Sequence, residues 1–454
     1  MSTVNKSALL TTLCQQVTST STSVNIENIT SLALAGKILG ETNVITVADV
    51  AQLPDLYFYP SPDGMLYFVD SIGVYAISFE YRWLTLDGRQ LRQDSDFIQA
   101  WTWGYNGSGR LGDNTTANKS SPVSVVGITD WCQVSSLSAH NLGIRASGAA
   151  WAWGSNTCGQ LGTGDLISRS SPVSVVGGFK DWCQVSAGAT HSTGLRANGT
   201  IWSWGCGGFG VLGNNSITNR SSPVSIVGGF TDWCQVSTNA FHTLALRSNG
   251  TAWAWGANSG GRLGDNSITS RSSPVSVVGG FTDWCQIAAA RFHSLGVRTN
   301  GTAWAWGYNT CGRLGDGTVV NSSSPVSVVG GFTDWCQVSG GIYNSVGVRT
   351  NGTAWTWGVN STGQLGDNTV VDKSSPVSVV GGFTDWCFVR AGWKHNHGIR
   401  TNGTLWTWGC NTFGELGDGT TTTRSSPVSV VGGFTNWTQI SNGDVHGIAL
   451  RGCA

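Results

Sequence analysis

The chain has 454 residues, and its 25 lysines and arginines balance its 25 aspartates and glutamates, so its formal net charge is zero. Only 11% of the residues are charged, against roughly 25% in an average globular protein, while glycine and tryptophan are abundant. This balance argues against a nucleic-acid partner, and the absence of any run near ~20 apolar residues argues against membrane insertion. The first residues have no apolar signal-peptide core, so we expect no secretion signal.

Residues 1–96 contain no repeat, and we expect them to form a small α+β module for attachment or oligomerisation. Apolar residues spaced for helices come first, and short alternating runs typical of strands follow. The expected elements are two short helices, a β-hairpin and one further strand, at residues 7–17 and 27–39, 64–69 with 73–79, and 82–88.

Three segments of this module carry a resemblance: Thr46–Asp55 (TVADVAQLPD), Pro62–Val69 (PDGMLYFV) and Trp83–Gly88 (WLTLDG). They resemble parts of structural proteins of bacteriophages, especially of phages of marine cyanobacteria. The resemblance implies a virion protein whose N-terminal module attaches to other virion proteins. The alternative is a folded cap with no viral meaning.

From residue 97 onward the chain is built of repeats. The motif Trp-x-Trp-Gly occurs seven times, with a first spacing of 50 residues and later spacings of 51. A second tryptophan, preceded by Asp or Asn, recurs every 51 residues. The motifs begin at Trp101, Trp151, Trp202, Trp253, Trp304, Trp355 and Trp406, and the second tryptophans are Trp131, Trp182, Trp233, Trp284, Trp335, Trp386 and Trp437.

Each repeat predicts four short strands, A to D. In the repeat that begins at Trp182, strand A is Cys-Gln-Val-Ser, strand B runs from His191 to Arg196, strand C begins at Thr200, and strand D begins at Pro223. Asn-Gly between B and C predicts a hairpin turn, because both residues tolerate positive φ. A proline that opens strand D is typical of an outer edge, where no ladder N–H is needed.

Four strands in about 50 residues are typical of one blade of a β-propeller. The array begins within strand C at residues 97–104 and ends with strands A and B at residues 437–451. Pairing of these two ends would complete one blade and close the ring. We therefore predict an all-β fold, a closed seven-bladed β-propeller of four-stranded blades over residues 97–454.

The order Gly-x-x-His, Asn-Gly, Trp-Gly-x-Asn, Gly-Gln-Leu-Gly-Asp and Pro-Val resembles the regulator-of-chromosome-condensation repeat. Residues 154–162 (GSNTCGQLG) and 358–367 (GVNSTGQLGD) are close matches. The resemblance covers about residues 97–454 and implies a seven-bladed propeller. It does not identify the function, because the family includes a nucleotide-exchange factor, ubiquitin-ligase modules and a secreted β-lactamase inhibitor.

Polar residues that recur in every repeat are expected to be structural, because a catalytic site needs a few unlike groups at one place. We expect each repeated histidine to fix its own A–B turn, with Asn344 in the seventh position; a metal-binding ring is the alternative. The histidines are His140, His191, His242, His293, His395 and His446.

The aspartates that follow Leu-Gly are expected to close turns, with Ca²⁺ binding as the alternative. Six repeated cysteines are expected to be small, buried and reduced. The aspartates are Asp113, Asp265, Asp316, Asp367 and Asp418, and the cysteines are Cys132, Cys183, Cys234, Cys285, Cys336 and Cys387. We predict no catalytic residues, no metal site and no cofactor, and hence no enzyme.

The repeats differ from one another mainly in their A–B and C–D loops, which an antiparallel blade places on one face. The B–C and D–A turns of the opposite face are nearly constant. Variable loops that carry aromatic residues and arginine indicate a recognition surface. The predicted binding residues are Trp393, Lys394, Arg291, Phe292, Tyr343, Phe241, Tyr105, Tyr308, Phe209, Arg110, Arg262 and Arg313.

These features favour a non-catalytic virion structural or binding protein, such as a phage tail fibre, a tail-associated protein or a capsid-surface protein. Residues 1–96 would bind other virion proteins, and the variable face would bind a host-surface molecule or a protein. Such a protein is assembled in the host cytoplasm, and it could form a homo-oligomer. The main alternative is a cytoplasmic interaction scaffold or enzyme inhibitor with the same propeller, and a third hypothesis is an enzyme such as a carbohydrate lyase or hydrolase.

Overall fold

The computed structural model describes residues 44–47, 66–69, 74–79, 82–85 and 98–452. The chain divides into two compact units, Met1–Phe97 and Ile98–Ala454. The helices expected at residues 7–17 and 27–39 lie outside the described residues. Within those residues, no helix has the length and apolarity that a bilayer crossing requires.

The described part of the first unit is one four-stranded sheet in the order β1-β2-β3-β4. Its strands are β1 (Val44–Val47), β2 (Leu66–Val69), β3 (Val74–Phe79) and β4 (Arg82–Thr85). The antiparallel pair β2–β3, with Val69 opposite Val74, confirms the expected hairpin. The parallel pairing of β1 with β2 was not expected from the sequence.

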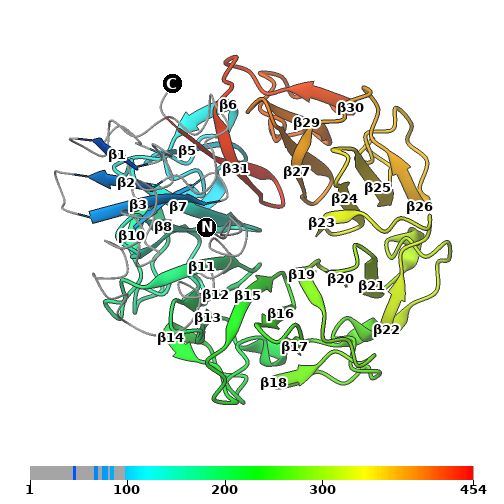
Figure 1. The fold of residues 1–454 in the computed structure, drawn as a ribbon, viewed down its shortest axis with the longest axis horizontal. Coiled ribbons are helices and arrows are strands. Elements are labelled where there is room, and N and C mark those ends of the chain that lie inside the picture. The colour runs from blue at the N-terminus through cyan, green and yellow to red at the C-terminus, as the bar shows by residue number, and fades with distance from the viewer. Residues whose placement is uncertain (1–43, 48–65, 70–73, 80–81, 86–97, 453–454) are drawn as a thin grey trace, which may run out of the picture. The chain divides into compact units, whose positions relative to one another are not determined.

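The second unit is a ring of seven four-stranded antiparallel sheets (Figure 1). Blades 1 to 6 are β7–β10, β11–β14, β15–β18, β19–β22, β23–β26 and β27–β30, and blade 7 is β31, β32, β5 and β6. Strands A of neighbouring blades contact one another around the ring, so strand A is innermost and strand D is outermost. This architecture confirms the predicted fold class.

The strands at each blade position begin and end at equivalent residues. Strands A are β7 (Trp131–Ser136), β11 (Trp182–Ala187), β15 (Trp233–Thr238), β19 (Trp284–Ala289), β23 (Trp335–Gly340), β27 (Trp386–Ala391) and β31 (Trp437–Asn442). Strands B are β8 (His140–Arg145), β12 (His191–Arg196), β16 (His242–Arg247), β20 (His293–Arg298), β24 (Asn344–Arg349), β28 (His395–Arg400) and β32 (His446–Arg451).

Strands C are β9 (Ala150–Gly154), β13 (Ile201–Gly205), β17 (Ala252–Gly256), β21 (Ala303–Gly307), β25 (Ala354–Gly358), β29 (Leu405–Gly409) and β5 (Gln99–Gly104). Strands D are β10 (Arg169–Ser174), β14 (Arg220–Ser225), β18 (Arg271–Ser276), β22 (Ser322–Ser327), β26 (Lys373–Ser378), β30 (Arg424–Ser429) and β6 (Lys119–Ser124). Short 3₁₀ turns η2 (Gly107–Gly109), η3 (Gly208–Gly210), η4 (Ser259–Gly261) and η5 (Thr310–Gly312) lie in C–D loops.

The blade that closes the ring combines both ends of the propeller sequence. Strand β32 pairs with β5 in antiparallel register, with His446 opposite Gly104 and Arg451 opposite Gln99. Figure 1 shows β5 and β6, drawn in cyan, completing the sheet that contains the red strand β31. The first and last strands are thereby held in one hydrogen-bonded sheet.

The hydrophobic core lies between blades rather than within one blade. One cluster joins Leu142 and Leu161 of blade 1 to Trp182, Val185 and Trp204 of blade 2. The Trp204 indole also donates a 2.9 Å hydrogen bond to the carbonyl of Gln160, in the preceding blade. The second tryptophan of Trp-x-Trp-Gly makes such a bond to the preceding blade in six of the seven blades, whereas Nε1 of Trp306 is buried without a hydrogen-bond partner in the described part of the chain.

Two local expectations need correction. In the B–C hairpin, Gly199 has a φ of +73° whereas Asn198 is not among the residues with positive φ. The Asn198 side chain instead accepts a 2.7 Å hydrogen bond from the Thr200 hydroxyl. Strand D begins three residues earlier than expected, at Arg220 in blade 2, and Pro223 lies where the register shifts, at a bulge that needs no N–H.

Candidate functional site

The A–B and C–D loops of all blades lie at one end of the strands, because each sheet is an antiparallel meander in chain order. We call this end the variable face. On it, a hollow of about 610 Å³ collects loops from blades 2 to 5. We call this hollow the aromatic basin; its walls are Phe209, Phe241, Ala257, Ser259, Arg262, Ile268, Ser270, Phe292, Tyr308, Thr310, Arg313 and Tyr343. Seven of the predicted binding residues are among them.

Phe292, from the A–B loop of blade 4, is the centre of the basin. Its ring centroid lies 6.2 Å from that of Phe241, 6.0 Å from that of Tyr343 and 6.0 Å from that of Tyr308. Phe209, at the edge, is 62% exposed. Aromatic residues from four consecutive blades thus line one hollow, and the rings from blades 3 to 5 contact one another.

Arg262 and Arg313 support this surface from below, because their side chains are buried. Arg262 donates hydrogen bonds to the carbonyls of Ser259 and Arg291, the latter at 3.0 Å, and so joins a C–D loop to an A–B loop. Arg313 makes the equivalent bonds to Thr310 and Ile342. The two guanidiniums lie 5.4–5.7 Å from ring centroids of the basin. These arginines hold the loops in place and add positive charge.

Arg291 forms an ion pair across the ring. Its Nη1 lies 3.8 Å from Oδ2 of Asp444, which belongs to blade 7. Its guanidinium also lies 5.4 Å from the centroid of Phe241. Burial raises the pKa of Asp444, and the positive charges of Arg291 and Arg110 act in the opposite direction. Asp444 was not among the predicted binding residues.

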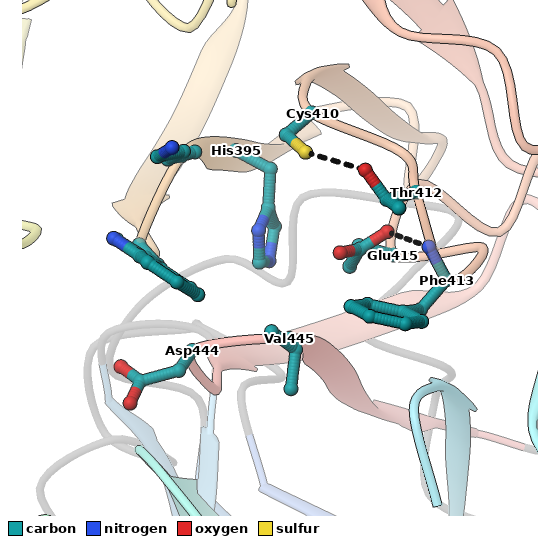
Figure 2. A pocket seen from close by; sticks show the side chains of 9 residues that line it. His395, Cys410, Thr412, Phe413, Glu415, Asp444 and Val445 are labelled. Carbon is teal, nitrogen blue, oxygen red and sulfur yellow. Dashed lines mark hydrogen bonds between the residues drawn. The ribbon is translucent and has the colours of Figure 1, made fainter.

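A second, smaller crevice of about 160 Å³ lies between blades 6 and 7. It is lined by Trp393, Lys394, His395, Cys410, Thr412, Phe413, Glu415, Asp444 and Val445. Figure 2 shows the His395 ring projecting between the loop that carries Glu415 and Phe413 and the segment that carries Asp444 and Val445. Burial raises the pKa of Glu415, whose Oε2 accepts a 2.7 Å hydrogen bond from the Phe413 N–H.

The predicted binding residues therefore occupy three places on the face. Trp393 and Lys394 line the crevice, and the Lys394 ammonium lies 5.2 Å from the centroid of the Trp393 ring. The Tyr105 ring centroid lies 5.2 Å from that of Phe413, with the ring planes tilted by 54°, and the Arg110 guanidinium lies 4.8 Å from the Tyr105 ring centroid. The remaining predicted residues lie in the basin or, as Arg291 does, against its rings.

A further set of exposed residues was missed in the sequence. The C–D loops of blades 1 to 5 carry aliphatic side chains that are 59–71% exposed: Leu166, Ile167, Ile217, Ile268, Val319, Val320, Val370 and Val371. We call them the apolar crescent. In blades 6 and 7 the equivalent positions hold Thr421, Thr422, Thr116 and Ala117. Aligning the C–D loops position by position would have revealed this difference.

The repeated histidines do not fix their own turns, so that expectation is wrong. Five of the six reach the next blade: for example, His140 Nε2 lies 2.8 Å from the Ser192 hydroxyl, and His242 Nε2 lies 2.7 Å from that of Ser294. Asn344 makes the same link to Asn396 at 3.2 Å. The histidines therefore tie neighbouring sheets together.

One junction lacks this link. Blade 7 has Gly447 where other blades have a hydroxyl or amide, and Nε2 of His395 is buried without a hydrogen-bond partner in the described part of the chain. A side chain at Gly447 would meet the Trp103 ring, because an added Cβ would lie 2.6 Å from it. The junction between blades 6 and 7 is thus chemically distinct, and the crevice lies there.

The aspartates after Leu-Gly close turns, as expected. Asp316 accepts hydrogen bonds from the Thr318 N–H at 3.0 Å and the Asn309 amide at 2.9 Å. An arginine ends strand B in every blade, and in blade 6 it is held by two contacts: Arg400 donates to Asp385 at 2.8 Å, and its guanidinium lies 4.1 Å from the Phe383 ring centroid. Both residue types are occupied by structural contacts.

The repeated cysteines are exposed, so the expectation that they are buried is wrong. In blade 2, Cys183 is the residue that the β11–β12 register skips, and its thiol donates to the Leu195 carbonyl. A disulfide joins two other cysteines, Cys158 of blade 1 and Cys206 of blade 2, with a Cα–Cα distance of 5.1 Å. It fastens two neighbouring C–D loops on the variable face.

Comparison with known families decides the relationship. Residues 95–395 match the RCC1-like domain, and residues 386–415 and 402–450 match the regulator of chromosome condensation (RCC1) repeat. The chain belongs to the RCC1-like domain family. Family membership agrees with the ring of seven antiparallel blades and with the repeated Trp-Gly and Leu-Gly turns.

Two curated relatives show how far the similarity extends. Over 275 residues the propeller is 30% identical to the ultraviolet-B receptor UVR8 of Arabidopsis thaliana, covering 59% of this chain and 62% of UVR8. Over 274 residues it is 29% identical to the E3 ubiquitin-protein ligase HERC2 of Homo sapiens, covering 58% of this chain and 6% of HERC2. The chain therefore spans less than two thirds of either relative.

Solved structures share the fold at low identity. Yeast RCC1 (Prp20), in a crystal structure with Kap60, has a TM-score of 0.71 and 18% identity, covering 79% of this chain and 90% of that chain. Human WBSCR16 has a TM-score of 0.70 and 19% identity, covering 78% and 98%. The shared feature is the propeller architecture.

Proposed function

We propose that the propeller is a non-catalytic protein-recognition module and that its partner binds the variable face. The observation that carries this proposal is the aromatic basin, in which Phe209, Phe241, Phe292 and Tyr343 from four blades form one surface. Exposed aromatic residues next to arginine are the composition of interface hot spots. The apolar crescent extends the same surface, and exposed apolar patches mark interaction sites.

The fold relatives support a protein partner. The yeast relative was crystallised bound to Kap60, and a second study of it describes binding to Gsp1p and histones. Those partners belong to the yeast protein. For this chain they support the choice of a protein as the class of ligand.

The polar groups of the crevice favour binding over catalysis. A thiol nucleophile needs a base within hydrogen-bond reach. The Cys410 thiol instead lies 3.2 Å from the Thr412 hydroxyl, and Glu415 accepts from a backbone N–H. We propose that Trp393 and Lys394 form the second contact area of the same face.

A finer proposal concerns where recognition takes place. The resemblance of the sequences Thr46–Asp55, Pro62–Val69 and Trp83–Gly88 to structural proteins of bacteriophages supports a virion protein that is attached through residues 1–96. The family matches begin at residue 95 and therefore concern the propeller. Immunogold labelling of particles would test this proposal: labelled virions support it, whereas protein confined to host cytosol favours the interaction scaffold or enzyme inhibitor.

The main test is affinity capture with the immobilised full chain and the variant Phe292→Ala/Trp393→Ala. Loss of hot-spot aromatic residues should weaken partner binding by at least about tenfold without unfolding the ring. Lys180→Ala, an exposed residue in the D–A turn of the opposite face, is the matched control. Equal capture by both variants would overturn the assignment of the face.

A further inference from the structure

The aromatic basin carries more positive charge than its surroundings neutralise. Three guanidiniums, those of Arg262, Arg291 and Arg313, lie 5.4–5.8 Å from centroids of the basin rings. Among the described residues, Asp444 is the carboxylate that pairs with any of them. Three positive charges therefore meet one negative charge.

The two buried arginines keep their charge. Their N–H groups donate to backbone carbonyls, which are neutral acceptors. Burial lowers the pKa of Arg262 to about 10, which still leaves the guanidinium protonated at neutral pH. The same charges help to lower the pKa of the nearby His242 and His293, after the larger effect of burial, so those rings stay neutral.

Arg291 is incompletely satisfied. Its Nε is buried and has no hydrogen-bond partner in the described part of the chain. Its ion pair with Asp444 measures 3.8 Å, whereas a charge-assisted N–H···O bond measures about 2.7–2.9 Å. A guanidinium can hold a carboxylate through two parallel bonds, which Asp444 does not achieve. A second carboxylate would be better bound than the one already there.

The rim of the basin adds apolar walls. Ile268, which lines the basin, belongs to the apolar crescent and is 71% exposed. Phe209, in the C–D loop of blade 2, also lines it. A ligand that pairs with Arg291 would therefore place its neighbouring groups on aliphatic and aromatic surface.

We propose that the aromatic basin binds a segment of a protein partner in which a glutamate or aspartate is flanked by apolar side chains. The carboxylate pairs with Arg291, and the apolar neighbours pack on Phe209, Phe292 and Ile268. Asp444 competes for Arg291 when no partner is bound. This inference rests on the proposed function, because it assumes that the variable face is the recognition face.

A selection from a library of random peptides, with the full chain as bait, tests the ligand chemistry. Selected peptides should be rich in Asp or Glu next to Leu, Ile or Phe. Their affinities, measured by fluorescence anisotropy, should fall about tenfold in Arg291→Met, which is the effect of losing one charged hydrogen-bonded pair. Arg220→Met removes the same charge from exposed strand β14 and should change nothing.

Asp444→Asn provides the decisive comparison. It removes the internal competitor, so acidic peptides should bind several-fold more tightly. Neutral or basic selected peptides, no selected peptides, or weaker acidic binding in Asp444→Asn would each overturn the acidic ligand. If the selected peptides lack carboxylates but Phe209→Ala/Phe292→Ala abolishes their binding, the variable face remains the recognition face. Binding that ignores this double variant would overturn both proposals.

Discussion

The imidazole of His140 hydrogen-bonds at 2.8 Å to the hydroxyl of Ser192, a residue of the neighbouring blade. Equivalent rings link other blades, and all seven histidines of the chain are buried. Burial lowers their pKa values, to about 3 for His140 and His191 and to about 4 for His397. The folded ring therefore holds these groups neutral at pH values where an unfolded chain would protonate them.

We predict that the propeller loses stability as the pH falls from about 6.5 to about 4. Unfolded imidazoles have a pKa near 6.5, so in this window the unfolded state binds more protons than the folded state. Each ring therefore lowers the free energy of unfolding by up to about 1.4 kcal/mol for every pH unit of acidification. Burial raises the pKa of Asp444 and Glu415, so these two carboxyl groups stabilise the folded state on acidification. Their effect is opposite to that of the seven histidines and comes from fewer groups. Lowered carboxyl pKa values, as for Asp265 and Asp418, act mainly below about pH 4. Denaturant unfolding measured between pH 5 and 7.5 checks the slope.

The matched control is His242→Asn, because Asn344 already fills the equivalent position in blade 5. This variant should reduce the pH slope by one proton while retaining a cross-blade hydrogen bond. An unchanged slope would show that the buried histidines do not govern acid stability.

A second disulfide can be installed between blades 4 and 5. Cys311 and Val359 occupy the positions of Cys158 and Cys206, whose Cα atoms are 5.1 Å apart. Gly260 and Tyr308 are the equivalent positions in blades 3 and 4, and they are also close together, since an added Cβ on Gly260 would lie 2.5 Å from the Tyr308 ring. We predict that Val359→Cys bonds to Cys311 and, in the chain-entropy treatment, stabilises the fold by at most about 4 kcal/mol.

Peptide mapping under non-reducing conditions would detect the new bond. Val359→Ser controls for the loss of the valine side chain. If Cys311 of the Val359→Cys variant still reacts fully with an alkylating agent, the blades are not equivalent at this position.

Hydrogen bonds between neighbouring innermost strands indicate which junction of the ring opens most easily. In six junctions the side-chain carbonyl of a glutamine in strand A accepts a hydrogen bond from a backbone N–H of the next strand A. Gln337 accepts such a bond from Val389 at 3.1 Å. Blade 6 has Phe388 at this position, so Ile440 receives no such bond from a described residue. We expect the Ile440 amide to exchange its hydrogen faster than the Val389 amide. Exchange rates resolved by residue check this, and equal protection would contradict a weak junction between blades 6 and 7.

Arg400 and Arg145 provide a comparison of nearly the same ion pair in two settings. Both donate to an aspartate, at 2.8 Å and 2.7 Å, but only Arg400 also lies over a phenylalanine, Phe383, at 4.1 Å. Arg145 lacks this partner because Gly127-Ile128 replaces Gly-Gly-Phe. Arg400→Lys should therefore cost more unfolding free energy than Arg145→Lys, by about 0.5–1 kcal/mol. Equal losses of thermal stability in the two variants would show that the contact between Arg400 and the Phe383 ring does not stabilise the fold.

Much of the fold was predictable because each repeat carries its own local signals. The Gly199 turn, the tryptophans at the strand ends and the unpaired strand C at the start of the array predicted four-stranded blades and their closure. One error concerns a side chain that reaches beyond its own repeat, and others concern the local geometry of a bulge or a turn. His140 bonds to Ser192, and Cys183 is exposed at a bulge, and neither fact can be read from alternation within one strand.

The candidate site shows the same division. Variation among the A–B and C–D loops identified Phe241, Phe292, Tyr308 and Tyr343 as candidates, because a repeat that differs from its copies is visible in the sequence. That they form one basin, with buried arginines beneath it, depends on loops from four blades meeting in space.

By itself, the sequence determined the number of blades, the strand order and the face that varies, since these depend on periodicity, turn residues and alternation. The tertiary structure alone decided that Arg291 of blade 4 meets Asp444 of blade 7 and that the linkage pattern changes between blades 6 and 7. The physical reason is that closing the ring brings together residues far apart in the chain, and their charges and unmatched hydrogen-bonding groups then act on one another.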